Sequence, residues 1–358
     1  MPQQTRGKKR AISRRRFLTG AGATGLATFS VIRRAAAQED KRLVIYNFDG
    51  NLGKFYRDHW IDPFATATGI QIDTITMTGS APPMAKIKAL VDAGKPDADV
   101  IPMQLSDYVF ATRNNMLSPI AREEIPEYQN LYPQFIYPHG PGLVLWCYGI
   151  AYNTEKIKDP PTAWRDLWSP AYKGKAGLNE ALFEQALQMV NLAFKGKTTP
   201  VDDETFAHLK RLRPNLVSLW TTGAQAEQLL RTGEVWITPL WNGRVFKLKD
   251  EGVPLDFVVP KEGFFVRHNP FCIPNGAKHP GWAKKWLNYV CHEDRQRVLA
   301  EKFYYASSNK KVTYTPDVAK RVVVSSPDVV AKAVREDFDG ILDNLPQWRK
   351  SWDAWKQS

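Results

Sequence analysis

The residue types that most often carry out chemistry in proteins do not form a recognisable catalytic or metal-binding pattern in this chain. The spacing of its histidines matches no metal site: His59, His139, His208, His268, His279 and His292. The sequence has no G-x-S-x-G nucleophile turn, no H-E-x-x-H zinc motif and no phosphate-binding loop. These observations argue against an enzyme, and they predict no catalytic residue, no cofactor and no bound metal.

The cysteines are few and odd in number: Cys147, Cys272 and Cys291. Such a set is not a disulfide framework. We therefore expect the three thiols to be buried as small apolar side chains.

The first 37 residues have the organisation of an export signal. They contain nine Lys or Arg residues and no Asp or Glu, and a weakly apolar stretch ends in the A-x-A site Ala35-Ala36-Ala37. This order predicts a cleaved signal peptide and not a transmembrane helix. The run Ser13-Arg14-Arg15-Arg16-Phe17-Leu18 resembles the twin-arginine export box. We therefore predict export through the twin-arginine translocase and a periplasmic location.

A basic tail that binds nucleic acid is the alternative for this segment. The formal net charge of the whole chain is +12, and the segment supplies nine of those positive charges. Its removal takes away most of the charge that would favour nucleic acid, so we predict no nucleic-acid partner. Cleavage after Ala37 leaves 321 residues, which is enough for two domains.

Short apolar runs alternate with helical patterns along the rest of the chain. Strands are expected at 43–47, 70–76, 99–102, 144–153, 235–240 and 271–274. Helices are expected at 54–67, 84–93, 224–232, 282–290, 293–303 and 345–356. This alternation predicts an α/β protein with binding sites at the carboxyl ends of its strands. Trp348, Trp352 and Trp355 have helical spacing and are expected to pack in the core.

Several motifs together resemble one known family. They are Tyr46-Asn47-Phe48, Thr68-Gly69-Ile70, residues 99–102, Trp164-Arg165-Asp166-Leu167-Trp168, Tyr172-Lys173-Gly174, Gly233-Glu234-Val235, Trp241-Asn242-Gly243 and Pro260-Lys261-Glu262-Gly263. In this order they resemble the periplasmic spermidine/putrescine-binding proteins over nearly all of the chain after the signal peptide. The elements around Trp164, Tyr172 and Trp241 are specific when taken together.

The resemblance implies a two-lobe type II periplasmic binding fold with a hinge of crossing strands. One lobe would hold residues 41–147 and 271–313, and the other would hold 148–270 and 314–358. Closure of the lobes around a small molecule is then expected. The implied role is the substrate-binding component of an ABC importer, a monomer that delivers its ligand to an inner-membrane ABC permease.

Ligand-binding positions also follow from the resemblance. Carboxylates would hold ammonium groups, and aromatic faces would contact methylenes and cations. Carried over position by position, the ligand-binding residues are Phe48, Asp49, Gln104, Ser106, Glu180, Glu184, Trp241, Arg267, Asn269 and Tyr305. Glu180 and Glu184 lie one helical turn apart, and which of them faces the cleft is left open.

Two of these positions depart from the family. Arg267 stands where the family has Trp, and Asn269 stands where it has Asp. A guanidinium favours a carboxylate or phosphonate over an ammonium group. The ligand is therefore expected to be polyamine-like, or a zwitterion such as an opine-like or amino-acid-like amine with its acid near Arg267.

Three alternatives remain open at this point. Ferric-binding relatives of the same fold use adjacent tyrosines, and Tyr304-Tyr305 is such a pair. A periplasmic enzyme is the second alternative, since many twin-arginine substrates carry redox cofactors. The third concerns Cys147 and Cys272, which fall on the two crossing strands and could form a disulfide in this fold.

Overall fold

The computed structural model describes residues 40–77, 81–324, 326, 329, 333, 334 and 336–357. The predicted signal peptide, residues 1–37, lies outside this part of the chain. Within the described residues, no helix combines the length and the apolar character that a membrane crossing requires.

The chain begins with a parallel α/β arrangement. Strand β1 (Arg42–Asn47) pairs in parallel with β2 (Gln71–Thr76). Between them lie α1 (Gly50–Tyr56), a π-helical segment (Arg57–Ile61) and α2 (Asp62–Thr68). Gly69 ends α2 in the left-handed conformation, with φ 67°, which a glycine adopts without steric cost. Helix α3 (Met84–Asp92), strand β3 (Ile101–Pro102) and helix α4 (Leu105–Arg113) follow.

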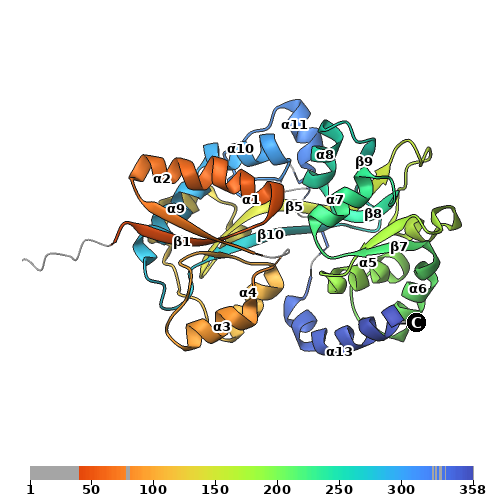
Figure 1. Ribbon diagram of the computed structural model, residues 1–358, viewed down its shortest axis with the longest axis horizontal. Helices are drawn as coiled ribbons and strands as arrows, with labels where there is room; N and C mark the ends of the chain where they lie inside the picture. The colour runs from red at the N-terminus through yellow and green to blue at the C-terminus, as the bar shows by residue number, and fades with distance from the viewer. Residues whose placement is uncertain are drawn as a thin grey trace, which may run out of the picture. The chain divides into compact units, whose positions relative to one another are not determined.

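Two long antiparallel strands cross the middle of the described chain (Figure 1). They are β5 (Gly140–Asn153), all of whose residues are buried, and β10 (Phe265–Cys272). They lie inside an eight-stranded sheet whose main strand order is β3-β10-β5-β8-β6-β7. The short strands β4 (Ile136–Tyr137) and β9 (Leu255–Val258) pair with β5 beside this path.

A second α/β series follows the first crossing. It contains β6 (Ala176–Asn179), α5 (Phe183–Lys195), α6 (Asp203–Leu212), β7 (Leu216–Trp220), α7 (Gly223–Arg231), β8 (Ile237–Trp241) and α8 (Asn242–Asp250). Strand β6 is parallel to both β7 and β8. Short 3-10 helices lie at Arg122–Glu124, Pro126–Asn130, Pro133–Phe135, Trp164–Trp168, Pro170–Tyr172 and Arg213–Asn215.

The last part of the chain is helical. It contains α9 (Pro280–Cys291), α10 (Glu293–Phe303), α11 (Pro316–Val322) and α13 (Phe338–Gln357). Helix α13 lies beside α4, α5 and α6 (Figure 1). Arg113 of α4 pairs with Asp339 and Asp343 of α13 at 2.6 Å each. The C-terminal helix therefore contacts elements from both α/β series.

A bulge interrupts the ladder between β5 and β10. Arg267 lies opposite Trp146 and Asn269 lies opposite Leu143, so Val144 and Leu145 together face His268. Val144 has φ 59°, which is an unusual conformation for a β-branched residue. Such bulges re-aim the flanking side chains, and here they set the positions of Trp146 and Asn269.

The cysteines are free and buried, as expected for small apolar side chains. Cys147 lies opposite Val266 in the ladder, and Cys272 lies opposite Ile101. Burial raises the pKa of both thiols. The disulfide alternative is therefore wrong for this structure.

Candidate functional site

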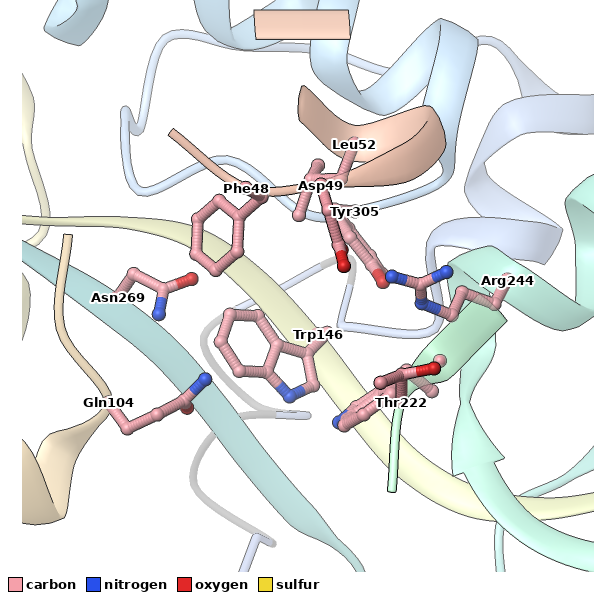
Figure 2. A pocket seen from close by; sticks show the side chains of 11 residues that line it. Phe48, Asp49, Leu52, Gln104, Trp146, Thr222, Arg244, Asn269 and Tyr305 are labelled. Carbon is pink, nitrogen blue, oxygen red and sulfur yellow. The ribbon is translucent and has the colours of Figure 1, made fainter. Parts of the chain in front are cut away.

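A pocket of about 470 Å³, including open solvent, lies where several strands and loops end. Its lining comes from the β1–α1 connection and α1, the start of α4, the two crossing strands, the starts of α7 and α8 and the segment after α10. The lining residues are Phe48, Asp49, Leu52, Gln104, Trp146, Thr222, Gly223, Trp241, Arg244, Asn269 and Tyr305. The carboxyl ends of parallel strands meet at such positions, which is where ligands bind in open α/β sheets. Figure 2 shows this pocket.

Aromatic rings form much of the pocket wall. Phe48, Trp146, Trp241 and Tyr305 are each at most 9% exposed. Trp146 and Tyr305 contact each other with ring centroids 6.1 Å apart. Buried rings of this kind offer apolar surface to methylene groups and a negative face to a cation.

A guanidinium and a carboxylate supply the charge of the pocket. Figure 2 shows the polar ends of Asp49, Tyr305 and Arg244 pointing toward one another. Arg244 forms an ion pair with Glu227 of α7, and the two side chains are only 12% and 15% exposed. Burial opposes the charge of Arg244, but the neighbouring carboxylates of Glu227 and Asp49 leave its pKa raised. The guanidinium is therefore a permanent positive charge at the pocket wall.

The start of α7 provides the space for this guanidinium. A Cβ atom on Gly223 would lie 2.4 Å from Cζ of Arg244. The missing side chain lets the guanidinium lie against the first residue of the helix. Thr222 caps the helix by accepting a hydrogen bond from the Gln225 backbone N–H at 3.1 Å. The positive end of a helix dipole and a fixed guanidinium together favour an anionic group at this end of the pocket.

Two buried hydrogen-bond donors in the pocket wall have no acceptor. The indole Nε1 atoms of Trp146 and Trp241 are buried, and neither has a hydrogen-bond partner among the described residues. Buried donors in native structures nearly always find an acceptor. Burial raises the pKa of Tyr305 to about 12, so its hydroxyl stays protonated and is a third donor in the pocket. The pocket therefore suits a ligand that carries acceptor oxygens.

Six of the ten predicted site residues line this pocket: Phe48, Asp49, Gln104, Trp241, Asn269 and Tyr305. The described lining does not include Ser106, Glu180, Glu184 or Arg267. Ser106 lies in the first turn of α4, and Glu180 pairs with Lys356 of α13. Their role in binding stays a prediction.

Sequence reasoning missed four residues that define the pocket chemistry: Trp146, Thr222, Gly223 and Arg244. Arg244 directly follows the Trp241-Asn242-Gly243 motif. The available signal was the position of Trp241, which was already assigned to the site at the start of a helix. The first turn of that helix, which contains Arg244, lies at the same end of the sheet.

Glu184 and Arg267 belong to a buried charged cluster. Nε of Arg267 donates to Oε2 of Glu336 at 3.0 Å, and its Nη2 donates to Oε1 at 2.5 Å. Nη1 of Arg267 lies 3.8 Å from Oε1 of Glu184. The side chains of Arg267, Glu336 and Glu184 are only 1%, 3% and 8% exposed. Burial raises the pKa of Glu184, and Arg267 opposes that rise.

The adjacent tyrosines have different surroundings. The Tyr304 hydroxyl hydrogen-bonds to Asp250 and to Arg321, whereas Tyr305 lines the pocket beside Arg244. A ferric site needs the two phenolic oxygens to converge, and a guanidinium beside one of them disfavours a cation. This geometry does not support the ferric-binding alternative.

Comparison with known proteins identifies the family of this chain. A family model described as bacterial extracellular solute-binding protein matches residues 59–326. This chain belongs to that family. The fold class and the resemblance on which it rested are confirmed, and the role as a substrate-binding component of an ABC importer agrees with the family. The family consists of solute-binding proteins and not of enzymes.

Two relatives of this protein are named for different ligands. A spermidine/putrescine-binding periplasmic protein of Escherichia coli is 30% identical, and the match covers 95% of this chain and 94% of the relative. A gamma-aminobutyric acid-binding protein of Pseudomonas aeruginosa is 25% identical over 92% of this chain and 95% of the relative.

A solved structure extends the comparison of the fold. The protein AgtB from Agrobacterium tumefaciens R10, in complex with agropinic acid, has a TM-score of 0.76 at 21% identity. The match covers 88% of this chain and 99% of that chain. This likeness supports the two-lobe type II fold.

Proposed function

We propose that this protein captures a small zwitterion in the periplasm and delivers it to an inner-membrane ABC permease. The ligand carries one ammonium group and one carboxylate, as amino-acid-like and opine-like compounds do. The protein binds this ligand as a monomer and does not convert it chemically. The ligand carboxylate lies at Arg244 and the start of α7, and its ammonium group lies against the aromatic rings of the pocket wall.

The unpartnered indole donors carry this proposal. Trp146 and Trp241 offer buried N–H groups, and Arg244 adds a guanidinium. A fully protonated polyamine has donors only and can satisfy none of them. A ligand carboxylate can pair with the guanidinium, and acceptor oxygens of the ligand can receive the indole N–H groups, whereas a guanidinium repels an ammonium group beside it. The name of the gamma-aminobutyric acid-binding relative fits the same ligand class.

A matched pair of ligands tests the proposal. Gamma-aminobutyric acid and putrescine have similar lengths, but one ends in a carboxylate where the other ends in an ammonium group. The screen contains gamma-aminobutyric acid, amino acids and opines. We expect zwitterions among them to raise the melting temperature of the protein by mass action. In calorimetric titration the best zwitterion should bind about 100-fold more tightly than putrescine, a difference of about 2.7 kcal/mol. Tighter binding of putrescine or spermidine than of any zwitterion would contradict the proposal.

The export route is part of the proposal and rests on the sequence alone. Replacing Arg14 and Arg15 with lysine keeps the charge of the signal but removes the arginine pair that the translocase reads. We expect the full-length precursor to accumulate in the cytoplasm, as measured by cell fractionation and the size of the protein. The matched control replaces Arg33 and Arg34 with lysine and should export normally. Undiminished export of the Arg14/Arg15 variant would refute the twin-arginine route.

A further inference from the structure

The buried cluster around Arg267 adjoins the pocket wall. Arg267 lies opposite Trp146 in the β5–β10 ladder, so both side chains project from the same face of the sheet. Trp146 lines the pocket. A second link to the pocket wall runs through α4. The Asp107 carboxylate accepts a hydrogen bond from the Gln104 backbone N–H at 3.3 Å, and Gln104 also lines the pocket. The cluster is therefore the next layer behind one end of the pocket.

Two carboxylates, from Glu184 and Glu336, meet at Arg267, and the Asp107 carboxylate lies near enough to Glu184 for their charges to interact. Glu184 lies in the first turn of α5, Glu336 precedes α13, and Asp107 lies in the first turn of α4. Burial, with a smaller contribution from the charge of Glu184, raises the pKa of Asp107 to about 7. This concentration of negative charge would be strongly unfavourable without a cation.

Arg267 is the cation that lies against Glu336 and Glu184. It is almost fully buried, it pairs with Glu336 through two hydrogen bonds, and it lies 3.8 Å from Glu184. Its guanidinium also lies 5.5 Å from the ring centroid of Phe338. Arg349 contributes positive charge near Glu184, but its guanidinium lies over the ring of Phe183 at 3.7 Å.

The surroundings of Arg267 have the composition of a site for an ammonium ligand. Two converging carboxylates and an aromatic face are the groups that bind such a cation. Here the cation is a side chain of the protein itself. A free diamine whose first ammonium group lay in the pocket would bring its second ammonium group toward this positive charge.

We propose that Arg267 is a built-in cation that occupies a second ammonium subsite and thereby restricts the ligand to a single ammonium group. This inference rests on the proposed function, because it explains how the pocket selects a zwitterion over a diamine. Arg267 is a specificity-determining residue that acts through Glu184 and Glu336. Specificity then comes from a repulsive element as well as from the attraction at Arg244.

Removal of the Arg267 charge tests the inference, with putrescine as the probe in calorimetric titration. The Arg267→Met variant removes the guanidinium that neutralises Glu184 and Glu336, and we expect it to bind putrescine at least about tenfold more tightly than the wild type does. The matched control Arg267→Lys keeps the positive charge and should show no gain. Adding Glu184→Gln and Glu336→Gln to Arg267→Met should reverse the gain.

Arg267→Met leaves buried acids unpaired and is therefore destabilised. If it does not fold, the double variant Arg267→Met/Glu336→Gln carries the test, because it removes one charge of each sign and keeps Glu184. A folded variant of either kind that binds putrescine no more tightly than the wild type overturns the inference. The proposed function fails through a different result, the ligand preference of the wild-type protein, so the two failures are distinguishable.

Discussion

Replacing Arg244 with methionine is expected to weaken zwitterion binding by about 100-fold or more, as measured by calorimetric titration. The guanidinium is held by Glu227 and by the space at Gly223, so it is in place before the ligand arrives. Loss of one partner from a buried, hydrogen-bonded charge pair costs about 2–5 kcal/mol of binding free energy. Binding of putrescine, which has no carboxylate, should not fall in parallel.

Two further variants separate charge from geometry at this position. Arg244→Lys keeps a positive charge but loses the planar fork that binds a carboxylate through two hydrogen bonds, so an intermediate loss of about tenfold is expected. The control is Arg231→Met, which removes an exposed arginine of α7 that pairs with Glu251. That variant should bind within about twofold of the wild type, since exposed ion pairs contribute little. Full affinity in Arg244→Met would show that the carboxylate does not bind there.

Most of the fold could be predicted from hydrophobic periodicity. The expected strand at 43–47 agrees with β1, and the helix at 293–303 agrees with α10 to the residue. Differences occur where local rules and tertiary packing disagree. The first helix begins at Gly50 and not at Lys54, because the Asp49-Gly50-Asn51 run, which resembles a turn, forms the first turn of α1.

The C-terminal helix is the clearest such difference. The helix was expected to begin at Leu345, and Pro346 would remove a hydrogen bond from a helix that began earlier. Helix α13 begins at Phe338 and continues through Pro346. Trp348, Trp352 and Trp355 are all buried, so the expectation that they pack in the core is confirmed. Their burial and the ion pairs with Arg113 hold the helix across the proline.

The charges of the site show what a single sequence cannot provide. Arg267 was expected to meet a ligand carboxylate, but its partner is Glu336, which lies 69 residues away along the chain. Residue type and position in a strand indicate which face of a sheet a guanidinium occupies. They do not indicate which acid from a distant segment of the chain neutralises it. The same reason explains why Arg244, held by Glu227 of another helix, was missed.

The Trp241-Asn242-Gly243 motif combines binding with structure. Trp241 lines the pocket. A Cβ on Gly243 would lie 2.3 Å from the Phe303 backbone oxygen and 2.5 Å from the Tyr305 ring, so glycine alone allows this approach. Asn242, which stands between Trp241 and Gly243 in the sequence, is fully buried. The motif therefore joins the start of α8 to the chain segment that carries Tyr305.

Asn242 makes the hydrogen bonds of this junction. Its Oδ1 accepts from the Cys147 backbone N–H at 3.0 Å. Its Nδ2 donates to the backbone oxygens of Tyr304 at 2.8 Å, of Arg321 at 3.1 Å and of Val322 at 3.3 Å. One amide thus connects the crossing strand β5 with the ends of α10 and α11.

Replacing Asn242 with alanine is expected to lower the free energy of unfolding by about 3–5 kcal/mol. The substitution leaves the buried Cys147 N–H and Tyr304 carbonyl without partners, and each unsatisfied group costs about 1–3 kcal/mol. Denaturant unfolding monitored by circular dichroism measures the loss, with a lower midpoint expected at an unchanged slope. The control is Asn344→Ala, which removes a single hydrogen bond to Gly340 on the exposed side of α13 and should cost less than about 0.5 kcal/mol. Equal stability of the two variants would mean that the junction relaxes around the missing amide, and the role assigned to the motif would then be wrong.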